Sequence, residues 1–403
     1  MRLLFVLGRY YPKPSANGVC VLRVQEALAQ RGVLSDVVAD GDVEETIDCQ
    51  YGKLYTGPIV NVSKLSTPER LAAAARYPLY FPSNIKWYGN TIDRALSENC
   101  YDAIIAVLRP LDGAFACAKY TNMLIYELDS VSNNDDNEHG YRRFLRPRTL
   151  HLEQALYEKA SYIFHMYSHK AHYSHRRYQR FAHKSAFLDI PQMVDEKIED
   201  RAAGDGDPVK ILYSGILTAR MRSPEYAITL MKELIRQGAV KAEMNFYSRG
   251  NCEDMLEEAQ RETEGAVHQH GYVSLEELNA AVGETDFLLS IGNTMSGKVT
   301  SLPSKVISYM SYGKPIIHID GGRNDTAKEY LAKYPLVLVI DPAADLQDNV
   351  KKLQSFLENS IGKRVPFTDI ERIFERNTPD YTAEHIIKAV SSRCIGTVIK
   401  REK

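Results

Sequence analysis

The sequence predicts an α/β protein built from two doubly wound domains that face each other across a cleft. The chain has 403 residues, more than the roughly 250–300 residues at which a single hydrophobic core stops growing. In both halves, apolar segments of strand length alternate with segments whose apolar residues recur at helical spacing, which is typical of parallel sheets covered by helices. A polar segment at residues 199–208 separates the halves and has the composition of a linker.

The first half opens with a strand, a loop, a helix and a second strand, the unit from which parallel sheets are built. Residues 3–7 form an apolar strand, and the loop after it contains two prolines and Gly18. The helix closes at Arg31-Gly32, and one side of it is apolar: Val21, Val24, Ala27 and Leu28. Further strands are expected at residues 36–39, 103–108, 123–128 and 161–166.

The same pattern restarts directly after the polar segment. A strand is expected at residues 209–214, a helix at 224–237 and a second strand at 243–247. Later strands are expected at residues 287–291, 316–319 and 336–340, alternating with helices. Because ligands bind at the carboxyl ends of parallel strands, we expect the binding residues to follow these strands in the sequence.

Composition excludes several classes of protein. The formal net charge of -2 argues against a dedicated nucleic-acid binder. No apolar run approaches the ~18 residues of a membrane span, and the N-terminus fits a buried strand better than a signal peptide. The six cysteines show no metal-binding or redox spacing, so neither a metal nor a bound cofactor is expected, and their scatter suggests a reducing, cytoplasmic location.

The most informative segment runs from Leu302 to Ile317 and contains a helix whose start suits an anion. Pro303 and Ser304 start the helix, with Ser304 as the expected cap, and Gly313 ends it before a buried strand. The amides of the first turn favour an anion, and Lys305 adds a positive charge there. An ordinary capped helix with a solvated lysine accounts for this pattern equally well.

This segment resembles the donor-binding helix of GT-B glycosyltransferases, especially the family 4 (group 1) type and its cell-surface polysaccharide relatives. Their pattern is P-S-K, an apolar pair, E-Y, a short gap, G-K-P and an apolar strand, and residues 303–317 match it closely. Upstream, Ile291-Gly292-Asn293 is similar to the strand end and loop that precede this helix in the family. The resemblance implies that Ser304 and Asn293 bind the donor and that Lys305 stabilises its diphosphate.

A second match opens the same half of the chain. The strand end at Ser214-Gly215, followed by Arg220, Arg222 and Ser-Pro-Glu, resembles the strand–glycine–loop whose basic residue contacts the donor diphosphate. Gly215 allows close backbone approach to a ligand, and an arginine fork suits phosphate oxygens. Arg222 is the better placed of the two arginines. The alternative is that both arginines are solvated loop residues. Lys305, a basic group at a different strand end of the same domain, favours a shared anion site instead.

Two further matches lie in the first half. The loop from Tyr11 to Val19 resembles the family's loop after the first strand, and its Gly18 is expected near the donor phosphate or the acceptor. Asp129 ends a strand at a position where relatives often carry an aspartate near the acceptor, so it is the candidate for a polar or basic role there. A turn glycine and a loop-capping carboxylate are the structural alternatives.

The sequence also departs from the family. Many family 4 enzymes carry two glutamates in the donor helix region, and at those positions this chain has Thr300 and Ser308. The second glutamate grips the nucleotide ribose, so the nucleotide and the retaining stereochemistry are left open, with Ser308 a weak substitute. Two Asp-x-Asp matches, at residues 40–42 and 205–207, are interpreted as chance rather than metal sites.

The resemblance implies four segments. Residues 1–200 form a Rossmann-like acceptor-side domain, 201–208 a linker, 209–378 a Rossmann-like nucleotide-sugar donor domain, and 379–403 a helical segment that packs back on the first domain. The expected activity is transfer of a sugar from a nucleotide-diphosphate sugar, without a metal, to an unknown glycan or lipid-linked glycan. A nucleotide-sugar epimerase of the same fold and an inactive partner protein remain alternatives.

A basic stretch is the last feature that bears on partners. From His165 to Lys184 the chain is rich in His, Arg, Lys and Tyr. One interpretation is peripheral contact with the anionic inner face of a membrane or with a lipid-diphosphate acceptor. The other is the solvated basic face of a helix.

Overall fold

The computed structural model describes residues 1–60, 65–69, 81–108, 110–131, 142–198, 206–238, 240–294, 302–322 and 325–392. The chain divides into two compact units. The first unit comprises Met1–Gln192 and Arg376–Lys403, and the second comprises Met193–Glu375. The division after residue 192 comes before the polar segment that we expected to be the linker, and residues 199–205 of that segment lie outside the described residues.

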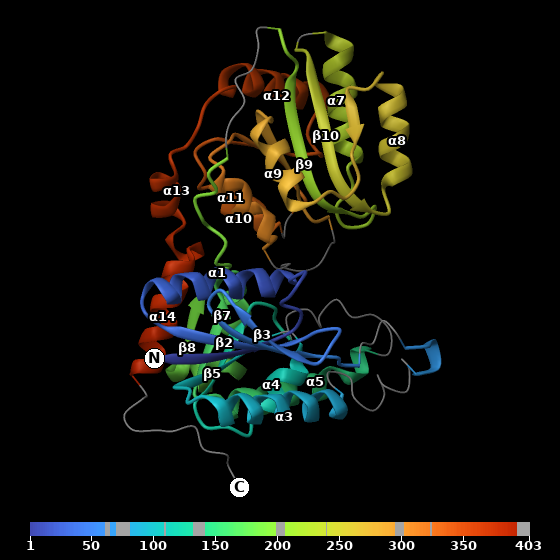
Figure 1. Ribbon diagram of the computed structural model, residues 1–403. Helices are drawn as coiled ribbons and strands as arrows, with labels where there is room; N and C mark the ends of the chain where they lie inside the picture. The colour runs from blue at the N-terminus through green and yellow to red at the C-terminus, as the bar shows by residue number, and fades with distance from the viewer. Residues whose placement is uncertain are drawn as a thin grey trace. The chain divides into compact units, whose positions relative to one another are not determined.

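In the first unit, the described residues form an eight-stranded sheet in the order β3-β4-β2-β1-β5-β6-β7-β8 (Figure 1). β3 and β4 pair antiparallel, and the other neighbours pair parallel. Strand order reverses direction between β1 and β5, the switch point at which open α/β sheets bind ligands. The strands are β1 (Arg2–Leu7), β2 (Leu34–Asp40), β3 (Glu45–Cys49), β4 (Gly52–Gly57), β5 (Ala103–Leu108), β6 (Met123–Glu127), β7 (Tyr162–Met166) and β8 (Ser185–Leu188).

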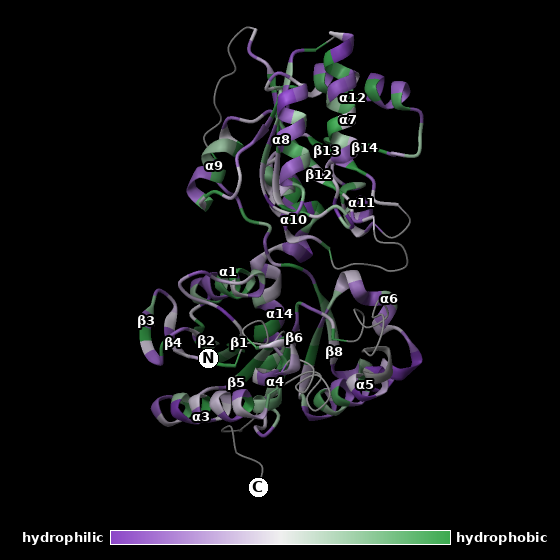
Figure 2. Cartoon of the chain, turned by 90° about the vertical axis from the view of Figure 1, so that its right-hand side faces the viewer, coloured by the Kyte–Doolittle hydropathy of each residue, from purple (hydrophilic) through white to green (hydrophobic). Residues whose placement is uncertain are grey.

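Helices cover both faces of this sheet, with α1 on one face and α3 and α4 on the other (Figure 1). Apolar side chains of α3, α4 and α5 pack on β1, β5 and β6 to form the main core, and Figure 2 shows β5, β6 and β8 as largely hydrophobic. The helices are α1 (Ala16–Gln30), α3 (Pro82–Glu98), α4 (Leu111–Cys117), α5 (Arg142–Lys159), η3 (Tyr167–His169), α6 (Lys170–Tyr173), η4 (Arg176–Lys184) and α14 (Pro379–Ser391).

The C-terminal helix α14 belongs to the first unit and lies against α1. Thr378 caps its start by accepting from the amide of Tyr381, at 3.1 Å. Arg31, at the end of α1, pairs with Asp380 at 2.5 Å. The apolar side of α14 is buried: Ala383, Ile386, Ala389 and Val390.

In the second unit, the described residues form a six-stranded parallel sheet in the order β11-β10-β9-β12-β13-β14 (Figure 1). Its switch point lies between β9 and β12. Helices α7, α8 and α12 pack on one face and bury a second apolar core. The strands are β9 (Val209–Leu217), β10 (Ala242–Gly250), β11 (Val267–Gln269), β12 (Phe287–Ile291), β13 (Ile316–Ile319) and β14 (Val337–Ile340).

Helices of the second unit connect its successive strands, and the last three helical segments follow β14. The helices are α7 (Glu225–Gln237), α8 (Glu253–Glu262), α9 (Leu275–Gly283), α10 (Ser304–Ser311), α11 (Thr326–Leu331), α12 (Leu346–Ser360), α13 (Phe367–Ile373) and the short η5 (Glu375–Asn377), which crosses into the first unit. The doubly wound class predicted from the sequence is therefore confirmed in both units.

Candidate functional site

The candidate site lies at the switch point of the second sheet, where β9 and β12 end. β9 runs through Gly215 to Leu217, and β12 ends just before Gly292 and Asn293. The helix α10 begins nearby at Ser304. The end of β9 therefore meets two segments that lie far from it in the sequence, the end of β12 and the start of α10.

Lys305 reaches from the first turn of α10 to the end of β9. Its Nζ donates to Tyr213 Oη at 2.7 Å and to the carbonyl of Ser214 at 2.8 Å, and it lies 4.0 Å from the centroid of the Tyr213 ring. A Cβ at Gly215 would lie 2.4 Å from Lys305 Nζ, and Gly215 has φ of 128°, a region that side chains rarely adopt. Gly215 is therefore needed both for the backbone path and to leave room for the lysine.

The charges at this edge are arranged as an anion site would require. Burial, with a smaller effect from the guanidinium of Arg222, lowers the pKa of Lys305 well below its usual range. Within the described ranges, no carboxylate pairs with either residue, and the buried Nε of Arg222 has no hydrogen-bond partner. Two neighbouring cations that lack a counter-charge are stabilised by an anionic ligand.

The start of α10 corrects one expectation. Pro303, not Ser304, occupies the cap position, with φ of -66° and ψ of 122°, and no side chain caps the helix. Ser304 is already the first helical residue, so its hydroxyl cannot precede the helix as a cap must. The cap residue therefore offers no side-chain acceptor to the first amides of α10, which suits the binding of an anion.

The loops after β9 and β12 are joined by hydrogen bonds. The amide of Thr294 donates to the carbonyl of Met221 at 2.9 Å. The hydroxyl of Thr294 donates to the carbonyl of Arg220 at 3.2 Å. Asn293 is buried, whereas the side chain of Arg220 is exposed. Arg222 is half-buried and bridges back to Thr218.

Of the two positions that carry glutamates in the family, Ser308 lies within the described residues. Ser308 is half-buried on α10, and its carbonyl accepts from the hydroxyl of Ser311 at 2.8 Å. Thr300 lies outside the described residues.

Sequence reasoning did not identify two tyrosines of this site. Tyr213 accepts the hydrogen bond of Lys305, and Tyr309 Oη accepts from the amide of Ser214 at 2.8 Å, which ties α10 to β9. Burial raises the pKa of Tyr309 to about 12. A tyrosine in a strand or on the apolar side of a helix has the pattern of a core residue, so only the E-Y element of the family pattern could have pointed to Tyr309.

In the first unit, Gly18 and Asp129 lie at the switch point between β1 and β5. Asn17 Nδ2 donates to Asp129 Oδ2 and to the carbonyl of Leu108, at 3.1 Å each. A Cβ at Gly18 would lie 2.6 Å from the carbonyl oxygen of Arg9, so this position requires glycine. Asn17, which sequence reasoning missed, thus joins the two predicted residues to one sheet edge.

A buried polar network lies beside Asp129. Glu127, at the end of β6, accepts from Tyr173 at 2.6 Å and from Tyr157 at 2.9 Å, and lies 2.6 Å from His165 Nδ1. Burial raises the pKa of Glu127, but the bonds from His165 and the tyrosines outweigh that effect and leave the pKa below its usual value. Tyr173 also bonds Ser130 at 2.7 Å, next to Asp129.

This network changes the interpretation of the basic stretch. His165 and His169 are buried, so they do not belong to a charged surface. The chain from 167 to 184 forms three short helical segments rather than one helix. Exposed basic residues remain along it: Lys170, His175, Arg176, Arg180 and His183.

The Asp-x-Asp sequence at residues 40–42 has a structural partner. Arg9 donates through both terminal nitrogens to Asp42, at 2.9 Å each. Within the described parts of the chain, no cluster of three or more His, Cys, Asp or Glu side chains is arranged to hold a metal ion. Of the second match, Asp205 lies outside the described residues.

None of the described helices combines the length and the apolar composition that crossing a bilayer demands. No sequence-family model matches the chain, and no curated protein sequence does.

Solved structures do resemble it. Sucrose-phosphate synthase from Thermosynechococcus elongatus has a TM-score of 0.65 at 12% identity, with 97% of this chain and 98% of that chain covered. An E. coli structure described as trehalose-6-phosphate bound with UDP-2-fluoro glucose has a TM-score of 0.60 at 11% identity, with 99% and 100% covered. WaaG, a glycosyltransferase involved in lipopolysaccharide biosynthesis, has a TM-score of 0.55 at 12% identity, with 98% and 100% covered.

At such identities the likeness establishes the fold alone. That fold is the GT-B fold of these glycosyltransferases, as the resemblance of residues 303–317 implied.

Proposed function

We propose that this protein is a glycosyltransferase that takes a sugar from a nucleotide-diphosphate sugar and transfers it to an acceptor hydroxyl. One observation carries the proposal: Lys305 and Arg222 lie close together at the switch point of the second sheet, and no described carboxylate pairs with either. An uncapped helix start beside them adds amide donors. The GT-B fold supports the same activity, because the similar structures include WaaG, which is described as a glycosyltransferase.

The chemistry assigns each group a task. The bond between the anomeric carbon and the β-phosphate oxygen breaks, its electrons remain on the departing nucleoside diphosphate, and the acceptor oxygen bonds to the anomeric carbon. Lys305, Arg222 and the first amides of α10 stabilise the charge that develops on the leaving phosphate. These side-chain cations supply the charge that a metal ion supplies elsewhere, so we propose a metal-independent hexosyl transfer.

The remaining predicted residues complete the donor and acceptor sides. The donor pocket is lined or supported by five residues: Gly215, Arg220, Asn293, Ser304 and Ser308. Asp129, fixed by Asn17, orients the acceptor hydroxyl and takes its proton as the acceptor oxygen bonds to the anomeric carbon, and Gly18 lies at the same sheet edge. The acceptor is a glycan or lipid-linked glycan of cell-surface polysaccharide or glycoconjugate synthesis, and the exposed basic residues between Lys170 and His183 suit an anionic lipid or membrane surface.

The test measures binding by calorimetry. The ligands are uridine, guanosine, adenosine and cytidine diphosphates and inorganic pyrophosphate. Lys305→Ala and Arg222→Ala should each weaken binding of the selected ligand about 10- to 100-fold, the usual effect of removing a charged hydrogen-bond donor. Turnover of the matching nucleotide-sugar should fall at least as much, because the leaving phosphate bears more charge than the bound donor.

The controls remove the same charges from exposed positions of the second unit, Lys333 just after α11 and Arg236 on α7. Lys333→Ala and Arg236→Ala should bind and turn over as the wild type does. Normal binding by Lys305→Ala and Arg222→Ala would refute the proposed site. Epimerisation of a nucleotide-sugar without an acceptor would favour an epimerase, and the absence of any nucleotide binding would favour an inactive partner protein.

A further inference from the structure

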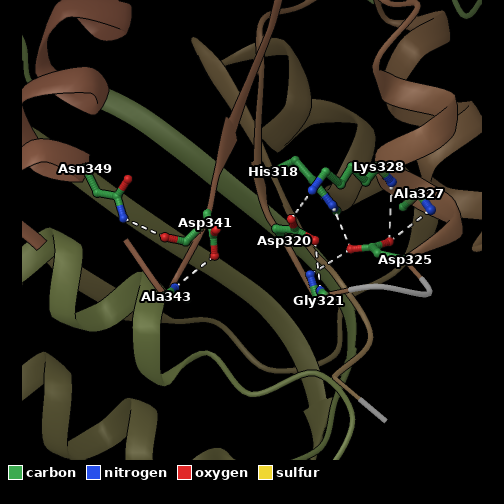
Figure 3. Close-up of polar contacts among 10 residues, drawn as sticks. His318, Asp320, Gly321, Asp325, Ala327, Lys328, Asp341, Ala343 and Asn349 are labelled. Carbon is green, nitrogen blue, oxygen red and sulfur yellow. Dashed lines mark hydrogen bonds and ion pairs between the residues drawn. The ribbon is translucent and has the colours of Figure 1, made fainter. Parts of the chain in front are cut away.

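A buried group of polar side chains lies where β12, β13 and the residue before α11 meet, and Figure 3 shows two of them, His318 and Asp325. His318 Nδ1 lies 3.1 Å from Ser290 Oγ, and its Nε2 lies 2.9 Å from Asp325 Oδ2. Ser290 is 2% exposed, His318 is 0% exposed and Asp325 is 5% exposed. Although the order Ser–His–Asp is that of a hydrolytic triad, no substrate can reach side chains so deeply buried, so the group acts on other parts of the protein.

The carboxylate of Asp325 makes several contacts at once. Oδ2 accepts from the amide of Gly321 at 2.8 Å as well as facing His318. Oδ1 accepts from the amide of Ala327 at 3.0 Å and so caps α11, as Figure 3 shows. Burial raises the pKa of Asp325, but His318 and the amides outweigh it, and the pKa lies below its usual value. The carboxylate is therefore held ionised by donors on three sides.

The loop after β12 is pressed against this carboxylate. A Cβ at Gly292 would lie 1.9 Å from Asp325 Oδ2 and 2.4 Å from the amide nitrogen of Gly321. A Cβ at Gly321 would lie 2.5 Å from the backbone of Asn293. Because no side chain separates these backbones, the position of Asp325 sets the position of Gly292 and Asn293.

The same loop then holds the loop that carries Arg222. Thr294 donates through its amide to the carbonyl of Met221, at 2.9 Å. Arg222 in turn pairs with Thr218 through an amide-to-carbonyl bond of 2.9 Å. A continuous series of contacts thus leads from His318 and Asp325 to the backbone of Arg222.

We infer that His318 and Asp325 are positioning residues for diphosphate binding, which act by fixing the loop of Gly292 to Thr294 and, through it, Arg222. The inference rests on the proposed function of the Arg222 and Lys305 site. An ionised carboxylate suits this task because its oxygens accept bonds from His318, Gly321 and Ala327 together. Asparagine would instead present an NH₂ group to at least one of these donors.

The experiment compares Asp325→Asn with Asp345→Asn. Asp345 caps α12 in the same unit by accepting from the amide of Asp348 at 3.1 Å, and it is exposed and bonds nothing near the pocket. Two properties are measured in each full-length variant. One is the affinity for inorganic pyrophosphate by calorimetry, and the other is hydrogen exchange of the Thr294 amide without ligand.

Asp325→Asn should weaken pyrophosphate binding about tenfold, or about 1.4 kcal/mol, and should speed exchange of the Thr294 amide, whereas Asp345→Asn should change neither. If Asp325→Asn does not fold, His318→Leu replaces it, with His318→Gln as the conservative variant expected to restore binding. A folded variant with wild-type exchange and affinity overturns the inference. Wild-type protein that does not bind pyrophosphate refutes the proposed function instead, and exchange of Thr294 then still tests the positioning.

Discussion

At the scale of single residues, the surroundings of Lys305 stabilise its positive charge only weakly. Its ammonium is held by one phenol oxygen and one carbonyl, both neutral, while Arg222 adds a second positive charge nearby. Burial and that charge lower the pKa of Lys305 well below its usual range. An anionic ligand reverses this effect because it stabilises the charged form.

This predicts that ligand binding takes up protons. Near pH 9, binding of pyrophosphate should raise the pKa of Lys305 back toward its usual range, with uptake of up to about one proton per site. Calorimetry in two buffers of different ionisation enthalpy measures the uptake. Lys305→Arg is the control. Because arginine stays charged, the proton uptake measured with this variant comes from the ligand itself and is subtracted from that of the wild type. Equal uptake by both proteins would contradict the prediction.

The sequence pointed to Lys305 and Arg222 because each follows or faces the end of a predicted strand. The structure brings the two residues near each other, and their binding of a donor stays a prediction. The sequence did not point to Tyr213 or Tyr309, because an aromatic residue with core periodicity gives no sign that its hydroxyl is used. The cap of α10 was also misplaced by one residue, since Pro303 and Ser304 both suit a helix start.

At the scale of elements, the Gly-Lys-Pro sequence after α10 has a structural task. Lys314 is 1% exposed, and its Nζ donates to the carbonyl of Thr285 at 2.6 Å and to that of Gly283 at 3.4 Å. These carbonyls lie at the end of α9, just before β12. Lys314 therefore joins the end of α9 to the segment that leads into β12.

Lys314→Met should lower the free energy of unfolding by about 1–3 kcal/mol, because it leaves buried carbonyls without donors. Urea unfolding followed by circular dichroism measures the change. Lys352→Met, an exposed position on α12, should have little effect. In the folded protein, Lys314→Met should bind pyrophosphate as the wild type does, whereas a loss like that of Lys305→Ala would assign Lys314 to the pocket instead.

Two of the strands that sequence reasoning missed, β3 and β11, share a physical cause. β3 is an edge strand with the pattern of an exposed loop, and β11 has only three residues. Such strands exist because a neighbouring strand supplies their hydrogen bonds, which no local pattern records. The central strands β1, β5 and β12 were predicted because buried parallel strands form continuous apolar runs.

At the scale of the whole molecule, the chain passes between the units twice, after Gln192 and after Glu375. The first unit is therefore completed by residues from the far end of the chain. α14 buries four apolar side chains there, and Asn377 donates to the carbonyl of Ile190 at 3.3 Å. Stability of the first unit thus depends on a segment that follows the whole second unit in sequence.

Deletion of residues 376–403 should lower the unfolding free energy of the first unit by roughly 3–5 kcal/mol, from loss of the buried apolar area of α14. Lys388→Ala, at an exposed position of α14, is the control and should cost little. Limited proteolysis and denaturant unfolding of the two variants distinguish them. If both variants leave the first unit equally stable, α14 does not contribute to its core.

The sequence by itself determined two doubly wound sheets and placed basic residues after their strands, because hydrophobic periodicity and turn residues are local properties. Tertiary structure alone decided that Lys305 bonds Tyr213 and Ser214 at 2.7 and 2.8 Å, and that Asp325 supports the loop before the pocket. These contacts join segments far apart in the chain, and they depend on strand order and close backbone approach, which pairwise spacing in a sequence does not encode.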